Sequence, residues 1–381
     1  MVGSFKSRVF IGVSLLWMGL AGGAIAPTYS LSLSQSISRS ALQPRATHLA
    51  QTTLAQTIAL DDPVVPVYEL SPPSPSVNPL PRQNPPDVPV NRDAWVATLQ
   101  RDSQGMLWVG SWQGLARINP NTGSVLARLN LPNTTIDDIA QDQAGRIWLG
   151  AYEGLKQVNP NYIPLTARSI TDLSNRILAL VVDRRGYLWV GTDSGLTMVN
   201  PDQGTLMTSF RTLPGGSANA LALDADGQLW VGTLNGVVQI NTASSLVMKE
   251  VPRLPGRTVQ AIALGPDNLI WAGTASGLLV INPANGAVVR SVTSFREKSV
   301  TAIGFDAADN VWVGTENGLF KANRASGAIL SEIVNLPSSQ VLALSPDTGN
   351  KVWVGTTQGL AWVSQTTGQT RTHMAFNRGS R

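Results

Sequence analysis

A seventeen-residue phrase that holds one tryptophan recurs along this chain and constrains its fold more than any other feature. The phrase reads LWVGTDSGLTMVNPDQG at 188–204, and variants of it begin at 107, 147, 229, 270, 311 and 352. The seven tryptophans are separated by 40 residues once and then by 41 residues five times. They are Trp108, Trp148, Trp189, Trp230, Trp271, Trp312 and Trp353. A period this regular indicates a repeat architecture in which each copy forms one structural unit.

Each copy divides into four runs rich in Val, Ile, Leu and Thr and bounded by turn residues, which predicts four β-strands. The run at 218–227 ends in a turn, where Asp224 and Gly227 suit a tight reversal with one residue at positive φ. LWVGT is the second run, GL-x-x-[VI]-N is the third, and AVVRSVTSF at 287–295 exemplifies the fourth. LWVG is almost continuously apolar, as expected of an inner strand buried on both faces. Four antiparallel strands at this period predict an all-β fold, a seven-bladed β-propeller over residues 93–381.

The repeated tryptophans are interpreted as scaffold and not as a ligand site. Burying one indole removes about 150–250 Å² from water and stabilises the fold by roughly 4–6 kcal/mol at about 25 cal/mol per Å². Packing between blades therefore accounts for them, and seven identical positions would not by themselves specify one ligand. The glycine two positions on, Gly191 in the third copy, is expected to leave room for the indole of the neighbouring blade.

Strand alternation divides the predicted propeller into two faces. The loop between the second and third strands lies on the face that carries the connections between blades. The Asp-x-x-Gly and Asn-Pro turns lie on the opposite face. Because the repeat explains the shared residues, specific binding is expected where the copies differ, in the loops and connections of the first face.

The candidate ligand-binding residues are the variable residues of that first face. Aromatic and acidic residues fall mainly in the loops of blades one to three, and basic residues fall on connections that mostly lead into blades five and six. Trp112 is the leading candidate, because a large apolar group is less usual in an exposed loop than a charge is. The eight candidates are Trp112, Tyr152, Glu153, Asp193 and Glu316 in the loops, with Arg176, Arg257 and Lys298 on the connections, where Arg296 also falls. Such a face could bind a sugar, a peptide or a small anion; alternatively, each is an ordinary solvated loop residue.

Residues 1–30 carry the pattern of a secretory signal. Lys6 and Arg8 precede an apolar run over 9–26, and small residues follow. The alternative is an uncleaved membrane anchor, since eighteen residues are close to the lower limit for spanning a bilayer. The sequence therefore predicts a periplasmic or extracellular protein that is attached to a membrane only if the signal stays uncleaved.

Residues 31–92 show no period that could bury a core. They are rich first in Ser, Gln and Thr and then in proline, with ten of the 24 prolines of the chain at 61–92. This composition predicts a disordered linker. The segment at 61–70 could alternatively add an outer strand to a blade, at an edge because of its prolines.

Composition excludes several classes of function. The chain has no cysteine, which rules out disulfides and thiolate chemistry. Its net charge is only +4 and no basic run with interleaved aromatics is present, so nucleic acid is not an expected partner. Of the two histidines, only His373 falls in the propeller, so neither a metal cage nor a catalytic triad is predicted. Asp224 and Asp226 lack the remaining ligands of a calcium loop and are assigned to a turn. No cofactor is expected.

The motif LW-[VL]-G-[TS]-x-x-GL-x-x-[VI]-NP resembles the two-component regulator propeller repeat, which occurs in the sensing regions of membrane-bound hybrid histidine kinases. The resemblance covers residues 94–377. It implies a propeller outside the cytoplasmic membrane that takes part in sensing ligands, often glycans. No kinase follows the seventh copy, so a stand-alone exported propeller is expected. A second resemblance is to seven-bladed lyases that open cyclic antibiotic esters with histidines, which are scarce here.

Three functions are open at this stage. The first is a non-catalytic recognition module, expected to be monomeric, that binds a glycan, peptide or envelope protein on the face of Trp112. The second is a hydrolase or lyase that uses carboxylates on that face. The third is a scaffold for assembling envelope proteins, and a fold of this kind hosts all three. The copies are complete, so the ring is expected to close without a blade shared between the termini.

Overall fold

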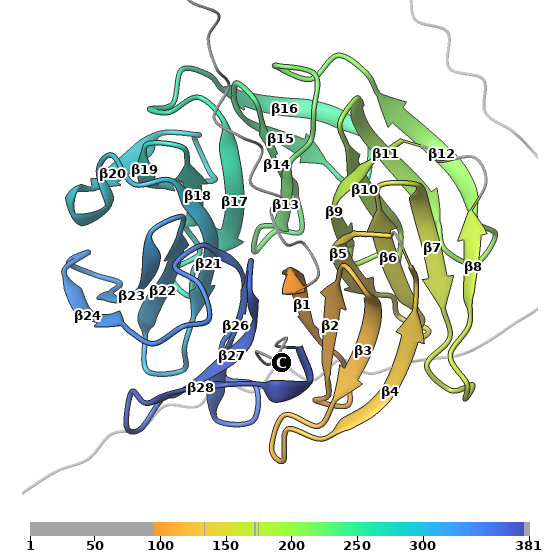
Figure 1. Cartoon of the computed structure of the whole chain (residues 1–381). Helices are drawn as coiled ribbons and strands as arrows, with labels where there is room; N and C mark the ends of the chain where they lie inside the picture. The colour runs from red at the N-terminus through yellow and green to blue at the C-terminus, as the bar shows by residue number, and fades with distance from the viewer. Residues whose placement is uncertain (1–93, 133, 171–172, 174, 377–381) are drawn as a thin grey trace, which may run out of the picture. The chain divides into compact units, whose positions relative to one another are not determined.

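The structure is a computed structural model, and it describes residues 94–132, 134–170, 173 and 175–376. These residues form seven four-stranded sheets arranged as blades around a ring (Figure 1). Within every sheet the strands are antiparallel and paired in chain order, so each blade is a meander. The predicted all-β, seven-bladed propeller is confirmed. The expected signal at 1–30 and linker at 31–92 lie outside the described residues.

Every blade contributes one strand to each of four positions, counted from the centre of the ring. The first strands are β1 (Val96–Arg101), β5 (Ile136–Gln141), β9 (Ile177–Val182), β13 (Ala220–Leu223), β17 (Val259–Leu264), β21 (Val300–Phe305) and β25 (Val341–Ser345). The second strands are β2 (Leu107–Ser111), β6 (Ile147–Ala151), β10 (Leu188–Thr192), β14 (Leu229–Thr233), β18 (Ile270–Thr274), β22 (Asn310–Thr315) and β26 (Lys351–Thr356). The third strands are β3 (Gly114–Ile118), β7 (Gly154–Val158), β11 (Gly195–Asn200), β15 (Gly236–Asn241), β19 (Gly277–Ile281), β23 (Gly318–Asn323) and β27 (Gly359–Ser364). The fourth strands are β4 (Val125–Asn130), β8 (Ala167–Ile170), β12 (Thr205–Phe210), β16 (Leu246–Val251), β20 (Val288–Val292), β24 (Ile329–Ile333) and β28 (Thr370–Thr372).

The second strand is the most buried of the four. Every residue of β2, β6, β10, β14 and β18 is buried. This burial explains the continuous apolar run, because neighbouring blades cover both sides of the strand. The strand closest to the centre is nevertheless the first one (Figure 1), and the fourth strand forms the exposed rim.

The seven tryptophans are buried scaffold residues, as predicted, and five of them share a hydrogen bond. Each indole is at most 2% exposed. In five blades the Nε1 group donates to the aspartate six positions earlier, as Trp230 does to Asp224 at 2.9 Å. The same aspartate accepts the backbone N–H groups of Asp226 and Gln228, which closes the turn between the first two strands. One buried carboxylate thus joins the turn to the core.

The expectation that the glycine after the tryptophan makes room for the next indole is wrong. A Cβ at Gly232 would lie 2.8 Å from Cγ1 of Val259, which begins the first strand of the following blade. Gly191 faces Ala218 in the same way. The glycine therefore lets the next blade's first strand approach the second strand closely.

Two local predictions had different outcomes, one for the turn of blade four and one for the fourth strand of blade five. Gly227 has φ of +78°, which confirms the positive φ predicted for the turn at 224–227. The fourth run of blade five is shorter than predicted, because β20 ends at Val292. Residues Thr293–Phe295 form the short helix η2, which buries the Phe295 ring in the core.

The ring closes without a shared blade, as expected, because β1–β4 and β25–β28 form separate complete sheets. β1 contacts β25 and β26. The last residues also contact the β3–β4 turn. His373 Nε2 lies 2.7 Å from the carbonyl oxygen of Gly123, and Arg128 stacks on Phe376 at 4.9 Å from the ring centroid. Phe376 belongs to the short helix η3 (Met374–Phe376).

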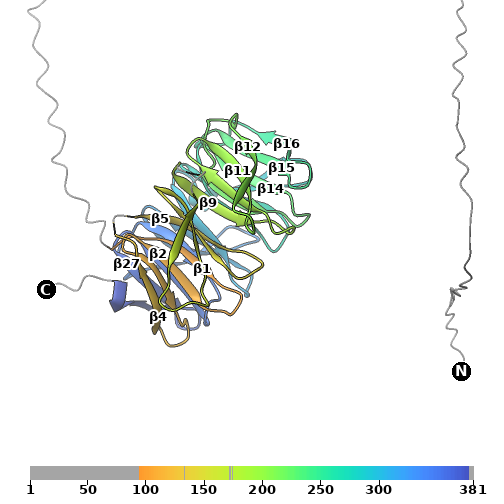
Figure 2. The same cartoon turned by 90° about the vertical axis from the view of Figure 1, so that its right-hand side faces the viewer.

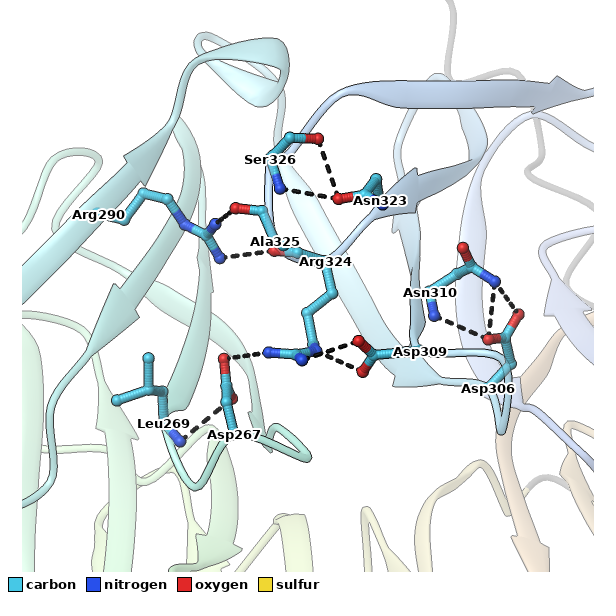
Figure 3. A network of polar contacts seen from close by, with 10 residues as sticks. All are labelled: Asp267, Leu269, Arg290, Asp306, Asp309, Asn310, Asn323, Arg324, Ala325 and Ser326. Atoms are coloured by element: carbon cyan, nitrogen blue, oxygen red, sulfur yellow. Dashed lines mark hydrogen bonds and ion pairs between the residues drawn. The ribbon is translucent and has the colours of Figure 1, made fainter.

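Ion pairs join neighbouring blades on the face of the turns. Arg324 bonds to Asp267 of blade five at 2.6 Å and to both carboxylate oxygens of Asp309 in its own blade (Figure 3). Arg146 of blade two bonds to Asp202 of blade three at 2.7 Å. In this pair the arginine belongs to the earlier blade and the aspartate to the later one. These pairs use long side chains to connect adjacent turns.

Candidate functional site

Two faces result from the strand order, and Figure 2 shows the propeller from the side, with its strands running between them. The connection face carries the loops between second and third strands together with the segments that join blades. The turn face carries the Asp-x-x-Gly and Asn-Pro turns. All eight residues selected as the ligand site lie on the connection face, in loops or connections.

Trp112 lines a pocket on the connection face at blade one. The pocket has a volume of about 350 Å³ and is lined by Trp112, Gln113, Asn130 and Pro132. Trp112 is half-buried and its backbone N–H donates to the carbonyl of Trp95 at 3.3 Å. Two amide side chains beside an indole and a proline ring offer both hydrogen bonds and an apolar surface.

Tyr152 and Glu153 follow in the loop of blade two. Tyr152 is 66% exposed. The carboxylate of Glu153 accepts a hydrogen bond from the hydroxyl of Thr134 at 2.9 Å and lies 3.7 Å from the ammonium group of Lys156. Glu153 therefore fixes the connection into blade two, whereas the Tyr152 ring is free to contact a ligand.

Arg176 lies between the carboxylates of blades two and three. Its Nε atom bonds to Asp137 at 2.9 Å, and its backbone carbonyl accepts the N–H of Asp193 at 3.3 Å. The hydrogen bond and charge of Asp137, supported by the charge of Asp193, raise the pKa of Arg176 above its usual value despite partial burial. We call Trp112, Tyr152, Glu153, Arg176 and Asp193 the aromatic–acidic sector.

Asp138 is adjacent to this sector and joins three first strands. It lies on β5 and accepts the Thr98 hydroxyl of β1 at 3.1 Å and the Leu180 N–H of β9 at 2.7 Å. The N–H of Ile139 also donates to it at 2.8 Å. Burial raises the pKa of Asp138 to about 6, against the effect of these hydrogen bonds and with a contribution from the charge of Asp137.

The other candidates lie on the far side of the ring. The connection at 252–258 passes between two loops, because the Gly236 N–H donates to the Arg257 carbonyl at 3.0 Å and Gly256 approaches the backbone of Ser276. The next connection carries Arg296 and Lys298. Glu316, in the loop of blade six, accepts the hydroxyl of Ser299 at 2.9 Å. We call Arg253, Arg257, Arg296 and Lys298 the basic sector.

The structure therefore separates the predicted site into two groups. It brings Tyr152, Arg176 and Asp193 together in blades two and three. Arg257, Lys298 and Glu316 belong to blades four to six. Arg176, which the sequence grouped with the basic residues, has its charge matched by Asp137 in the aromatic–acidic sector.

Sequence reasoning missed Asp137 and Asp138. The signal was present, because the first strand of blade two reads IDDIAQ where those of blades three and five read ILALVV and VQAIAL. Two adjacent carboxylates at a position that is otherwise apolar or uncharged mark a departure from the repeat. Asn130, at the end of β4, and Pro132, on the connection that follows, were not predicted either, because neither carries a charge or an aromatic ring that distinguishes it from an ordinary loop residue.

The chemistry available in the described residues is limited. His373 lies at the ring closure, where Nε2 meets a backbone carbonyl, and is distant in the chain from both sectors. No group of three or more His, Cys, Asp or Glu side chains in the described residues is arranged to hold a metal ion. Among the residues that the structure describes, no helix is long and apolar enough to span a bilayer.

Comparison with known proteins confirms the resemblance inferred from the motif. The chain contains two-component regulator propeller repeats, because the sequence model of that family matches residues 130–153, 171–194 and 212–235. Each match runs from a connection through two strands to the following loop. A search of curated proteins gave no match.

Solved structures share the fold. One is the extracellular domain of a hybrid two-component system from B. thetaiotaomicron, with a TM-score of 0.63 and 19% identity. The match covers 72% of this chain but only 40% of that one. Another is a catalytically inactive virginiamycin B lyase from Staphylococcus aureus with quinupristin, with a TM-score of 0.60, 16% identity, and coverage of 70% and 93%. At these identities the likeness shows the fold alone.

Proposed function

We propose that the protein is an exported, non-catalytic recognition module that binds a short glycan at the aromatic–acidic sector. The observation that carries the proposal is the pocket of about 350 Å³ beside Trp112. Exposed aromatic rings bind the apolar faces of sugars, and flanking amides and carboxylates bind hydroxyl groups. Tyr152, at 66% exposure, extends the aromatic surface towards blade two.

We infer an envelope location as part of this proposal. The repeat family and the extracellular domain of a hybrid two-component system are consistent with a sensing role outside the cytoplasm. The basic and apolar start of the sequence favours export. A glycan module in the envelope could act alone or signal through a separate protein.

The enzyme alternative depends on Asp138, whose raised pKa is a property of many catalytic carboxyl groups. Its three hydrogen-bond donors instead favour a structural link between first strands. The lyase shares the fold at 16% identity, and its chemistry does not transfer at that level. Turnover of a labelled glycan that stops in an Asp138→Asn variant would favour the enzyme.

Thermal unfolding against a panel of oligosaccharides and peptidoglycan fragments tests the glycan proposal. A ligand at about 100 times its dissociation constant stabilises the fold by roughly 2.7 kcal/mol, which raises the midpoint by several degrees. We expect Trp112→Ala and Tyr152→Ala to abolish the shift. Tyr162→Ala is the matched control, because Tyr162 is also 66% exposed but follows β7 on the turn face. Loss of the shift in all three variants, or in none, would contradict the proposed site.

A further inference from the structure

We propose that the basic sector is a second binding site, separate from the glycan site, and that its ligand is an extended acidic peptide of a partner protein. The sector consists of Arg253, Arg257, Arg296 and Lys298 on two successive connections. Its cations outnumber the neighbouring carboxylates of Glu297 and Glu316, which are both exposed.

The guanidinium groups of the sector are available to a ligand. Arg253, Arg257 and Arg296 are exposed, and in the described chain no hydrogen bond or ion pair joins their side chains to another residue. Arg146 and Arg324 on the turn face differ, since each of them holds two carboxylates. A planar guanidinium without an internal partner is suited to bidentate binding of an external carboxylate.

The backbone holds these arginines in an unusual conformation. Arg253 and Arg257 have φ of 60° and 52°, in the left-handed region that bulky residues seldom adopt. Gly256 between them has φ of +78° and packs so closely on Ser276 that a Cβ would lie 2.6 Å from its backbone nitrogen. Two arginines are thus fixed on one short connection at a conformational cost, which is characteristic of functional loops.

The sector is continuous across blades four to six. The Arg257 carbonyl bonds to Gly236, and the Ser276 carbonyl accepts the Glu297 N–H at 2.9 Å. Loops and connections therefore alternate without a break along the connection face. An extended chain that crosses them would meet Arg257 first and Arg296 next.

An aliphatic side chain favours a peptide over an acidic polysaccharide. Leu234 is 45% exposed and lies in the loop next to the connection of Arg257. In the described loops of blades four and five, Leu234 is the large apolar side chain that is exposed. The aromatic rings suited to sugars belong to blades one and two. A peptide with carboxylates flanking one apolar residue would match both features.

Fluorescence anisotropy with the full chain tests this site. The probe is a fluorescein-labelled peptide, Glu-Glu-Leu-Glu-Glu, and its neutral counterpart is Gln-Gln-Leu-Gln-Gln. We expect binding of the acidic peptide only, weakened at high salt because screening shortens the range of the charges. The double variant Arg257→Gln, Arg296→Gln should lose about tenfold in affinity or more.

The matched control is the double variant Arg101→Gln, Arg168→Gln, which removes two exposed arginines elsewhere and gives the same net charge. The fluorescence of the buried tryptophans reports whether each variant is folded. Equal loss of affinity in both double variants, equal binding of the two peptides, or binding of polygalacturonate but not of the peptide at these arginines would each overturn the proposal. Trp112→Ala leaves peptide affinity unchanged, so failure of this site is distinguishable from failure of the glycan site.

Discussion

At the residue scale, one buried carboxylate in each of five blades organises the repeat. Asp224 is 3% exposed and accepts the indole of Trp230, the side-chain amide of Gln239 and two backbone N–H groups. Blade five departs from this pattern, because Gly265 stands where the aspartate would be and Trp271 Nε1 has no hydrogen-bond partner in the described chain. The tryptophan therefore stays for its packing even where its hydrogen bond is lost.

Replacement of Asp224 by alanine should lower the free energy of unfolding by about 3 kcal/mol, because several buried donors lose their acceptor at once. Urea unfolding monitored by tryptophan fluorescence measures the change. Asp226→Ala is the control, since Asp226 lies exposed in the same turn, and its effect should stay within about 0.5 kcal/mol. Similar losses in the two variants would show that the turn, and not the Asp224 carboxylate, carries the stability.

Asp138 should make stability depend on pH. Because its pKa in the folded protein is about 6, above the ordinary 3.8, the folded state binds the proton more tightly than the unfolded chain. The free energy of unfolding then falls as pH rises from about 4 to about 6, by on the order of 2 kcal/mol from this group. Asp138→Asn removes this titration. The free energy of unfolding of the wild type minus that of the variant should therefore decline as pH rises over the same window. Parallel profiles in urea unfolding at each pH would exclude the effect.

At the element scale, blades are joined through the glycine of the second strand. The glycine admits the first residue of the next blade's first strand, as Gly232 admits Val259, and Gly355 meets Val96 at the ring closure. The closing junction therefore repeats the packing of the others. The contacts of Arg128 and His373 add to it.

Gly232→Ala should destabilise the fold by about 1–3 kcal/mol, because the new methyl group overlaps the side chain of Val259. Val259→Ala should partly relieve the overlap. The double variant should then lose less stability than the sum of the two single losses, as measured by thermal or urea unfolding. Simple additivity would mean that the two residues do not oppose each other across the junction.

The sequence was sufficient to predict the strands, but not which residues of neighbouring blades pack against each other. Period, turn residues and apolar runs predict four strands per copy and the alternation of faces. The identity of the residue opposite Gly191 depends on the rotation between blades, which no local pattern contains. The Asp–Trp hydrogen bond could have been predicted from the sequence, since the spacing of six residues between the two recurs in five copies. Its energetic role follows only from the burial of both partners.

At the scale of the whole molecule, the scaffold is nearly uniform and the connection face is not. On the connection face, blades one to three present aromatic rings and carboxylates, and the connections into blades five and six present Arg253, Arg257 and Arg296 without internal partners. The sequence predicted which face varies and named most of these residues. It could not predict that Arg176 is neutralised by Asp137, because that pair joins residues 39 apart on different blades.

The most direct test of the central claim is hydrogen–deuterium exchange of the full chain with the oligosaccharide that gives the largest thermal shift. The account predicts protection of the loops at 111–114, 151–154 and 192–195, with the turns of the opposite face unchanged. Protection confined to the turn face, for example at 142–146, would contradict it, and so would uniform exchange in a complex that calorimetry shows to be saturated.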